Sequence, residues 1–146
     1  MRAFYDVLNS QGIATGTVAK TILQMTAPAQ GAIVPVQSIA FDGTASADGK
    51  ILVELVRGTS AGTGTAVTPA ARGSNNLASV PAPTGKENFS AEPTGGTVIH
   101  RDYAAPYGNY VFPVGEVVLA PSEQLNIRVT SPAGHNATGN FSRVEV

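Results

Sequence analysis

The sequence predicts an all-β domain: a two-sheet sandwich of eight to ten short strands, most simply wound as a jelly roll. Short runs rich in Val, Ile, Thr and aromatic residues alternate in polarity, as strands with one buried face do. Glycine and proline supply 16 and 10 of the 146 residues, which is more than usual and implies many turns. No stretch carries a helical repeat for longer than one turn. An immunoglobulin-like sandwich is the alternative, although the Cys and Trp landmarks of antibody domains are absent.

The stretch from Lys50 to Gly58 is the centre of this pattern. On an extended strand Ile51, Val53 and Leu55 point to one face, while Glu54 stands between two apolar residues on the other. A run that is apolar on both faces is typical of a strand inside a sheet. The run is also too short for a buried helix. It therefore predicts a central strand.

Further strands are expected on both sides of this one. Residues 124–130 alternate most regularly, which predicts Leu125, Ile127 and Val129 on a buried face and the polar residues between them in water or at an interface. Pro35 predicts that its strand starts at a sheet edge, because proline has no N–H to donate to a neighbour. The other expected strands are Met1–Gly12, Thr17–Thr26, Ile33–Phe41, Thr97–Tyr103, Asn109–Val114, Val117–Ala120 and Gly139–Val146. Two shorter strand segments, Thr65–Thr68 and Glu87–Ala91, are expected inside a long irregular stretch.

Length and charge limit the class of protein. One domain spanning residues 1–146 is expected from the length. Charged residues make up 13% and the net charge is −1, which argues against a nucleic-acid-binding surface. A surface of neutral polar residues is easier to desolvate, so it suits either a protein packed against neighbours or simply a neutral β-protein. Neither a signal peptide nor an apolar run of membrane-spanning length is found, so synthesis as a soluble cytoplasmic chain is expected.

Two segments are candidates for contact with a partner. Residues 1–12 form either a core or edge strand or an arm that reaches another subunit. Residues 59–96 lose periodicity and fill with Gly, Ser, Ala, Thr and Pro, which is typical of a long functional loop between sheet segments and predicts an interface loop. Two tyrosines farther on either form a rim or pack at strand ends. The candidate contact residues are Phe4, Tyr5, Pro69, Arg72, Pro81, Pro83, Tyr103 and Tyr107.

Catalytic and metal-binding patterns are weak in this chain. His100 and Asp102 share one face of a strand, but a general base needs a nucleophile and a metal needs three or more ligands. An ordinary polar pair is therefore expected there. Asp42, Asp48 and Glu54 lack the spacing of a calcium loop, and Gly62-Thr-Gly-Thr lacks the Lys and helix of a phosphate loop. No catalytic residue, cofactor or metal is predicted, and the protein is expected not to be an enzyme.

Five segments resemble small structural proteins of tailed bacteriophages, and the likeness spans most of the chain. They are Ser38-Ile-Ala-Phe-Asp-Gly-Thr, Val53-Glu-Leu-Val-Arg-Gly-Thr, Gly62-Thr-Gly-Thr-Ala-Val-Thr-Pro, Ser90-Ala-Glu-Pro-Thr and Leu125-Asn-Ile-Arg-Val-Thr-Ser-Pro-Ala. The resemblance is one of strands and turns and carries no site residues. It implies a head decoration, or cement, protein: a β-sandwich, often a trimer, that sits on the assembled capsid and locks neighbouring capsomers.

That resemblance implies the major capsid protein as partner, a homotrimer, and a place on the exterior of the virion after synthesis in the host cytoplasm. No nucleic acid, membrane or small-molecule substrate is expected. The alternative function is a glycan- or receptor-binding module of a phage tail fibre or baseplate, which exposed aromatic residues beside a groove would favour.

Overall fold

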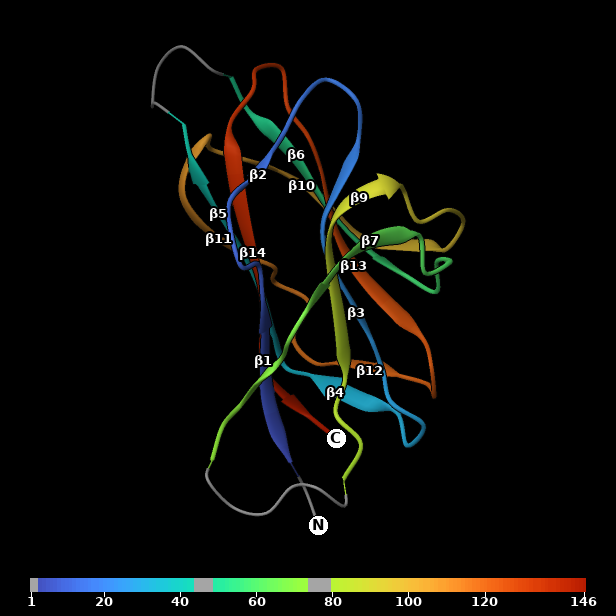
Figure 1. Ribbon diagram of the computed structural model, residues 1–146. Coiled ribbons are helices and arrows are strands. Elements are labelled where there is room, and N and C mark those ends of the chain that lie inside the picture. The colour runs from blue at the N-terminus through green and yellow to red at the C-terminus, as the bar shows by residue number, and fades with distance from the viewer. Residues whose placement is uncertain (1–2, 44–48, 74–79) are drawn as a thin grey trace.

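The computed structural model describes residues 3–43, 49–73 and 80–146, and within these ranges the chain forms fourteen strands and no helix. Two antiparallel sheets pack face to face (Figure 1). Sheet A contains β1 (Phe4–Leu8), β2 (Ile13–Ala14), β4 (Ala32–Val34), β5 (Val36–Asp42), β8 (Ala70–Ala71), β11 (Tyr107–Val111), β12 (Val117–Leu119) and β14 (Asn136–Glu145). Sheet B contains β3 (Lys20–Thr26), β6 (Ile51–Arg57), β7 (Thr63–Val67), β9 (Thr84–Ala91), β10 (Thr97–Ala104) and β13 (Gln124–Thr130). The predicted two-sheet sandwich is confirmed.

In each sheet a strand from the end of the chain pairs with a strand from its beginning. Sheet A runs β11-β5-β14-β1-β8, with β2 and β4 also on β14 and β12 on β4, and sheet B runs β10-β6-β13-β3-β9-β7. The last strand of each sheet therefore lies between strands from the first half of the chain. At the end of the sandwich where both termini lie, Ala3 and Val146 exchange two backbone hydrogen bonds of 3.1 and 3.0 Å (Figure 1).

The central strand of the sequence pattern is central in the fold. β6 lies between β10 and β13, and Ile51, Val53 and Leu55 are fully buried between the sheets. These residues meet the inward side chains of sheet A, among them Ile39 and Phe141, in one hydrophobic core. Alternation along the strand, with every second side chain toward the core, accounts for this placement.

The outward side of β13 departs from the prediction. Leu125, Ile127 and Val129 are buried as expected, but Asn126, expected in water or at an interface, is only 1% exposed. Its amide nitrogen donates to the Thr59 hydroxyl at 2.8 Å, and its amide oxygen accepts from Gln24 at 2.7 Å. The turn after β6 thus covers this part of the sheet and supplies a hydrogen-bond acceptor for the buried Asn126 amide.

The number of strands exceeds the eight to ten expected. The predicted strand over residues 33–41 is two strands, β4 and β5, separated by Pro35, whose missing N–H interrupts the ladder. β2 and β8 have two residues each and leave no periodic signal in the sequence. The jelly-roll winding remains a prediction.

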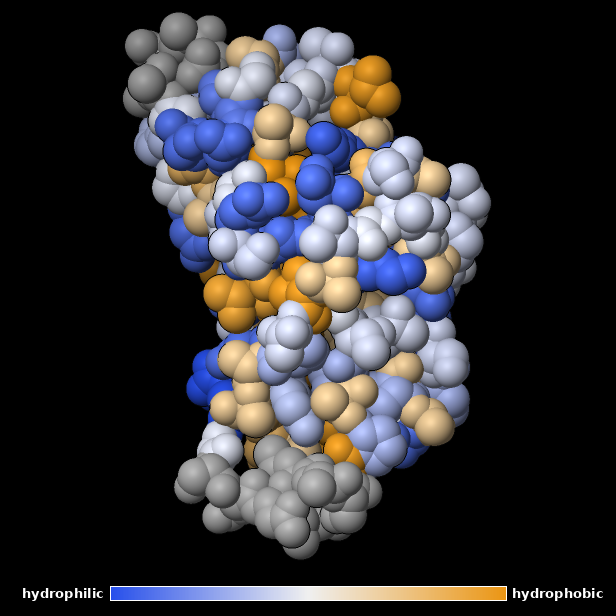
Figure 2. Space-filling model, in the orientation of Figure 1, coloured by the Kyte–Doolittle hydropathy of each residue, from blue (hydrophilic) through white to orange (hydrophobic). Residues whose placement is uncertain are grey.

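The segment predicted as a long interface loop, residues 59–96, contains three strands, β7, β8 and β9. β7 and β9 pair with each other and extend sheet B, and β8 crosses to pair with β1. β9 begins at Thr84, three residues before the predicted start. The sequence pattern misses this beginning because Gly85, at an inward position, has no side chain to mark the alternation. The surface over β7, β9 and the neighbouring loops is mostly pale in Figure 2, as expected for residues of intermediate hydropathy. Residues 74–79 of the predicted loop lie outside the described residues.

Candidate functional site

A cluster of ion pairs lies on the outer face of sheet B. On sheet B, Glu54 binds both Arg101, at 2.6 Å, and Arg128, at 3.0 Å, across neighbouring strands. Burial raises the pKa of the Glu54 carboxyl, but hydrogen bonds and charge from Arg128 and Arg101 outweigh burial and bring the pKa below its usual value. This face is therefore built around fixed ion pairs.

One part of the outer face of sheet A is built from small neutral residues. Gln37, Ile39 and Phe41 of β5 point to the core, so the alternate residues point outward. Register extends the same face across β11 and β14, where Asn109, Ala40 and Thr138 form one cross-strand row. The neutral face, as we define it, comprises Val36, Ser38, Ala40, Asn109, Val111, Thr138, Asn140 and Ser142. None of these side chains ionises, so a partner could cover them without desolvating a charge.

Apolar side chains and ion pairs border the neutral face. Tyr107 is 51% exposed on the edge strand β11. On the opposite side Leu8 of β1 is 40% exposed, and Asp6 of the same strand pairs with Arg72 at 2.7 Å. Small neutral residues thus lie at the centre of this side of sheet A, with apolar and charged groups around them.

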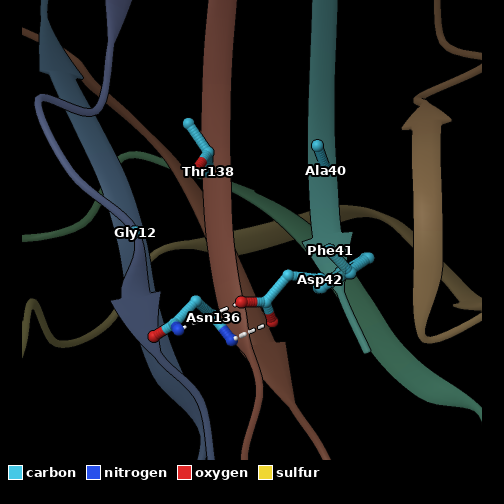
Figure 3. A pocket seen from close by; sticks show the side chains of 6 residues that line it. All are labelled: Gly12, Ala40, Phe41, Asp42, Asn136 and Thr138. Carbon is cyan, nitrogen blue, oxygen red and sulfur yellow. Dashed lines mark hydrogen bonds between the residues drawn. The ribbon is translucent and has the colours of Figure 1, made fainter. Parts of the chain in front are cut away.

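A hollow of about 410 Å³ lies at one end of the neutral face, lined by Gly12, Ala40, Phe41, Asp42, Asn136 and Thr138. Figure 3 shows Asp42 of β5 and Asn136 of β14 joined by two hydrogen bonds, of 2.7 and 3.1 Å. The backbone N–H of Asn136 is the main reason why the pKa of Asp42 is lowered. Both oxygens of the Asp42 carboxylate already accept hydrogen bonds from Asn136. Asp42 is the one ionisable side chain that lines this hollow, so the lining holds no unpaired acid or base.

The predicted contact residues do not form one cluster. Phe4 and Tyr107 lie on the outer side of sheet A, whereas Tyr103 lies on the outer side of sheet B. Tyr5 and Pro83 are buried, which corrects their assignment as contact residues: Tyr5 points inward from a strand paired on both sides, so residues 4–8 are part of the sheet and not an arm. The remaining three, Pro69, Pro81 and Arg72, are at least partly exposed beside β8 and before β9.

Sequence reasoning missed the neutral face itself. Ser38, Ala40 and Thr138 are the kinds of residue found on any strand, and their grouping depends on pairing between β5 and β14. The available signal was the alternation of residues 36–42, in which the outward positions up to residue 40 are small and uncharged. The tyrosines were expected either at a rim or packed at strand ends; Tyr103 and Tyr107 are in fact 62% and 51% exposed.

His100 and Asp102 meet through a third residue. Both point to the same side of β10, and the Tyr110 hydroxyl of β11 donates to Asp102 at 3.0 Å and lies 2.8 Å from His100 Nε2. The Phe112 ring packs edge-on against the rings of His100 and Tyr110. The described residues contain no group of three or more metal-ligating side chains. In the suggested calcium cluster, Glu54 is paired with arginines and Asp48 lies outside the described residues.

Tyr110 yields a prediction at alkaline pH. Burial, followed by the hydrogen bond and charge of Asp102, raises the pKa of Tyr110 to about 12. We expect one of the four tyrosines to ionise late in an ultraviolet titration of the folded protein, and Tyr110→Phe to remove that component. Because the unfolded chain loses this proton first, the free energy of unfolding falls as pH rises from about 10 to about 12. A late component that persists in Tyr110→Phe would contradict the assignment.

Comparison with family models, with curated proteins and with solved structures finds no match for this chain. Within the described ranges no helix has the length and apolar character to cross a membrane.

Proposed function

We propose that this chain is a non-enzymatic virion structural protein: a decoration, or cement, protein that binds the outer surface of an assembled bacteriophage head and stabilises contacts between capsomers. Its partner is the major capsid protein and its site of action is the capsid exterior, after synthesis in the host cytoplasm. The observation that carries this proposal is the neutral face of sheet A, together with the phage-like strand and turn segments. Covering that face desolvates no ionised group.

The size of the face favours attachment through several copies. The three strands that carry the face, β5, β11 and β14, are about 4.8 Å apart and about 20 Å long, so they span roughly 300 Å². That is well under half of the roughly 800 Å² per partner of a standard stable interface. A single copy would then bind weakly, whereas three copies in a homotrimer would bind at high effective concentration and gain avidity from modest contacts.

We also infer that the sandwich is a jelly roll. Its eight main strands, in chain order, are β1, β3, β5, β6, β10, β11, β13 and β14. Their neighbours support this winding: β1-β14-β5-β11 form one four-stranded layer and β3-β13-β6-β10 the other, so that the first strand pairs with the last and the second with the next to last. β7 and β9 are then an insertion that widens the second layer.

The proposal is tested by sedimenting the purified protein with empty phage shells. We expect the protein to pellet with shells, and Ala40→Lys to weaken binding at least about a hundredfold, because a lysine buried in each of three linked contacts is penalised three times. The matched control is Ala91→Lys, at an exposed position of β9 in sheet B, which should bind like the original chain. Failure of the unmodified protein to pellet with any shell would overturn the proposed function. Equal binding by both variants would exclude the neutral face.

A further inference from the structure

Sheet B carries a second surface feature, at the end of its outer face. A hollow of about 350 Å³, which we call the Tyr103 shelf, is lined by Thr17, Lys50, Leu52, Tyr103, Thr130, Ser131 and Pro132. Tyr103, Leu52 and Thr130 are cross-strand neighbours on three adjacent strands. Tyr103 is 62% exposed, so most of its ring is accessible above a floor of aliphatic carbon.

The walls of the Tyr103 shelf are held in place by hydrogen bonds between two loops. Ser131 N–H donates to the Gly16 carbonyl at 2.9 Å, and Thr15 N–H donates to the His135 carbonyl at 2.7 Å. His135 N–H returns a bond to the Thr15 hydroxyl at 3.0 Å. Thr17 and Pro132 follow directly in these two loops. A ligand would meet a preformed site and would spend little of its binding free energy on ordering the protein.

Among the described residues around the hollow, the cations Arg101, Arg128 and Lys50 outnumber the acids Glu54 and Asp102. Arg101 precedes Tyr103 by two residues and so points to the same side of β10, where it and Arg128 share the single carboxylate of Glu54. Lys50 adds another cation at the hollow itself. Asp102, on the opposite side of β10, offsets part of this positive charge. Hydrogen bonds from the Tyr103 N–H and the Tyr110 hydroxyl are the main reasons why the pKa of Asp102 is lowered, and the charge of Lys50 contributes less. The field at the hollow therefore favours an anion.

The geometry points to a binding site for an acidic saccharide at the Tyr103 shelf. The apolar face of a pyranose ring would lie on the Tyr103 ring and Leu52, its hydroxyls would reach Thr17 and Thr130, and its carboxylate would face Lys50. An aromatic face, a few hydroxyls and one cation around an apolar floor match the mixed surface of such a sugar, as small-ligand sites generally do. This site lies on the other sheet from the neutral face and does not depend on the proposed function.

The test is titration of the full chain with an oligosaccharide of glucuronic acid, followed by nuclear magnetic resonance shifts, beside a glucose oligosaccharide of equal length. We expect the acidic sugar to bind more tightly, and Tyr103→Ala to weaken its binding at least about tenfold through loss of ring contact. Tyr103→Phe should retain it. Lys50→Gln should bring the acidic sugar to the affinity of the neutral one, because their difference is the charge contact.

Control variants distinguish sugar binding at the Tyr103 shelf from nonspecific binding and from contacts of the neutral face. Tyr107→Ala removes a tyrosine that is 51% exposed on sheet A and should leave sugar binding unchanged. Tyr103→Ala should leave shell binding unchanged. All three substituted side chains are exposed, and circular dichroism would verify that the variants are folded. Absence of shifts with the acidic sugar, shifts unaffected by Tyr103→Ala, or equal binding of a glutamate-rich peptide would each overturn the inference.

Discussion

Replacing Phe141 with alanine is expected to lower the free energy of unfolding by about 3–5 kcal/mol. Phe141 is fully buried and lies in β14, whose neighbours at this position are Val7 of β1 and Gln37 of β5. The substitution would leave a cavity between the two sheets at the strand that joins the beginning and end of the chain. Urea unfolding followed by circular dichroism measures the loss.

The matched control is Phe4→Ala. Phe4 lies on the neighbouring strand β1 but is 40% exposed, so its truncation opens no enclosed cavity and should lower stability by less than about 1 kcal/mol. Losses of similar size in the two variants would mean that the layer between the sheets is not the main hydrophobic core.

Removing the buried carboxylate of Glu87 is expected to have the second largest effect. Glu87 of β9 is 1% exposed, and it accepts hydrogen bonds from the Ser10 N–H at 2.6 Å and the Ser10 hydroxyl at 2.8 Å. The neighbouring Asn9 side chain donates a hydrogen bond to the Ile22 carbonyl and accepts one from the Gly139 N–H. These contacts connect the turn after β1 to both sheets. Glu87→Ala would truncate a buried side chain and leave the Ser10 N–H and hydroxyl without their charged acceptor, at a loss of about 3 kcal/mol.

Two further variants isolate the carboxylate in this prediction. Glu87→Gln keeps one acceptor oxygen and the approximate volume, so it should lose about 1 kcal/mol. Glu116→Ala, at an exposed position between β11 and β12, should be close to neutral. Near-zero losses for both Glu87 variants, again from urea unfolding, would show that the Ser10 contacts do not hold this turn.

The sequence was sufficient for those parts of the fold that depend on local alternation. β6 and β13 were predicted almost to their ends because each run of apolar residues is regular and each faces the core. The burial of Asn126 was not predictable in this way, since it follows from a turn after β6 that folds back over the strand. Burial of Tyr5 was likewise decided by pairing with β14, over one hundred residues away in sequence.

The candidate site was harder to predict from the sequence than the fold was. A search for chemistry naturally selects histidines, acids, prolines and tyrosines, and of these Tyr107 and Tyr103 proved exposed on separate faces. The neutral face has no such marker. It arises because outward residues of β5, β11 and β14 that are individually unremarkable become adjacent through long-range register. Strand pairing between distant segments is the information that a single sequence lacks.

The most direct measurement of the central claim is the accessibility of each outer face with the protein on shells and free in solution. The chain has no cysteine, so a single thiol at Ala40→Cys or at Tyr103→Cys reports on one face alone. If the neutral face contacts the capsid, shell binding will slow alkylation at position 40 severalfold and leave position 103 unchanged. Unchanged alkylation at position 40 on shells that demonstrably carry the protein would contradict the account.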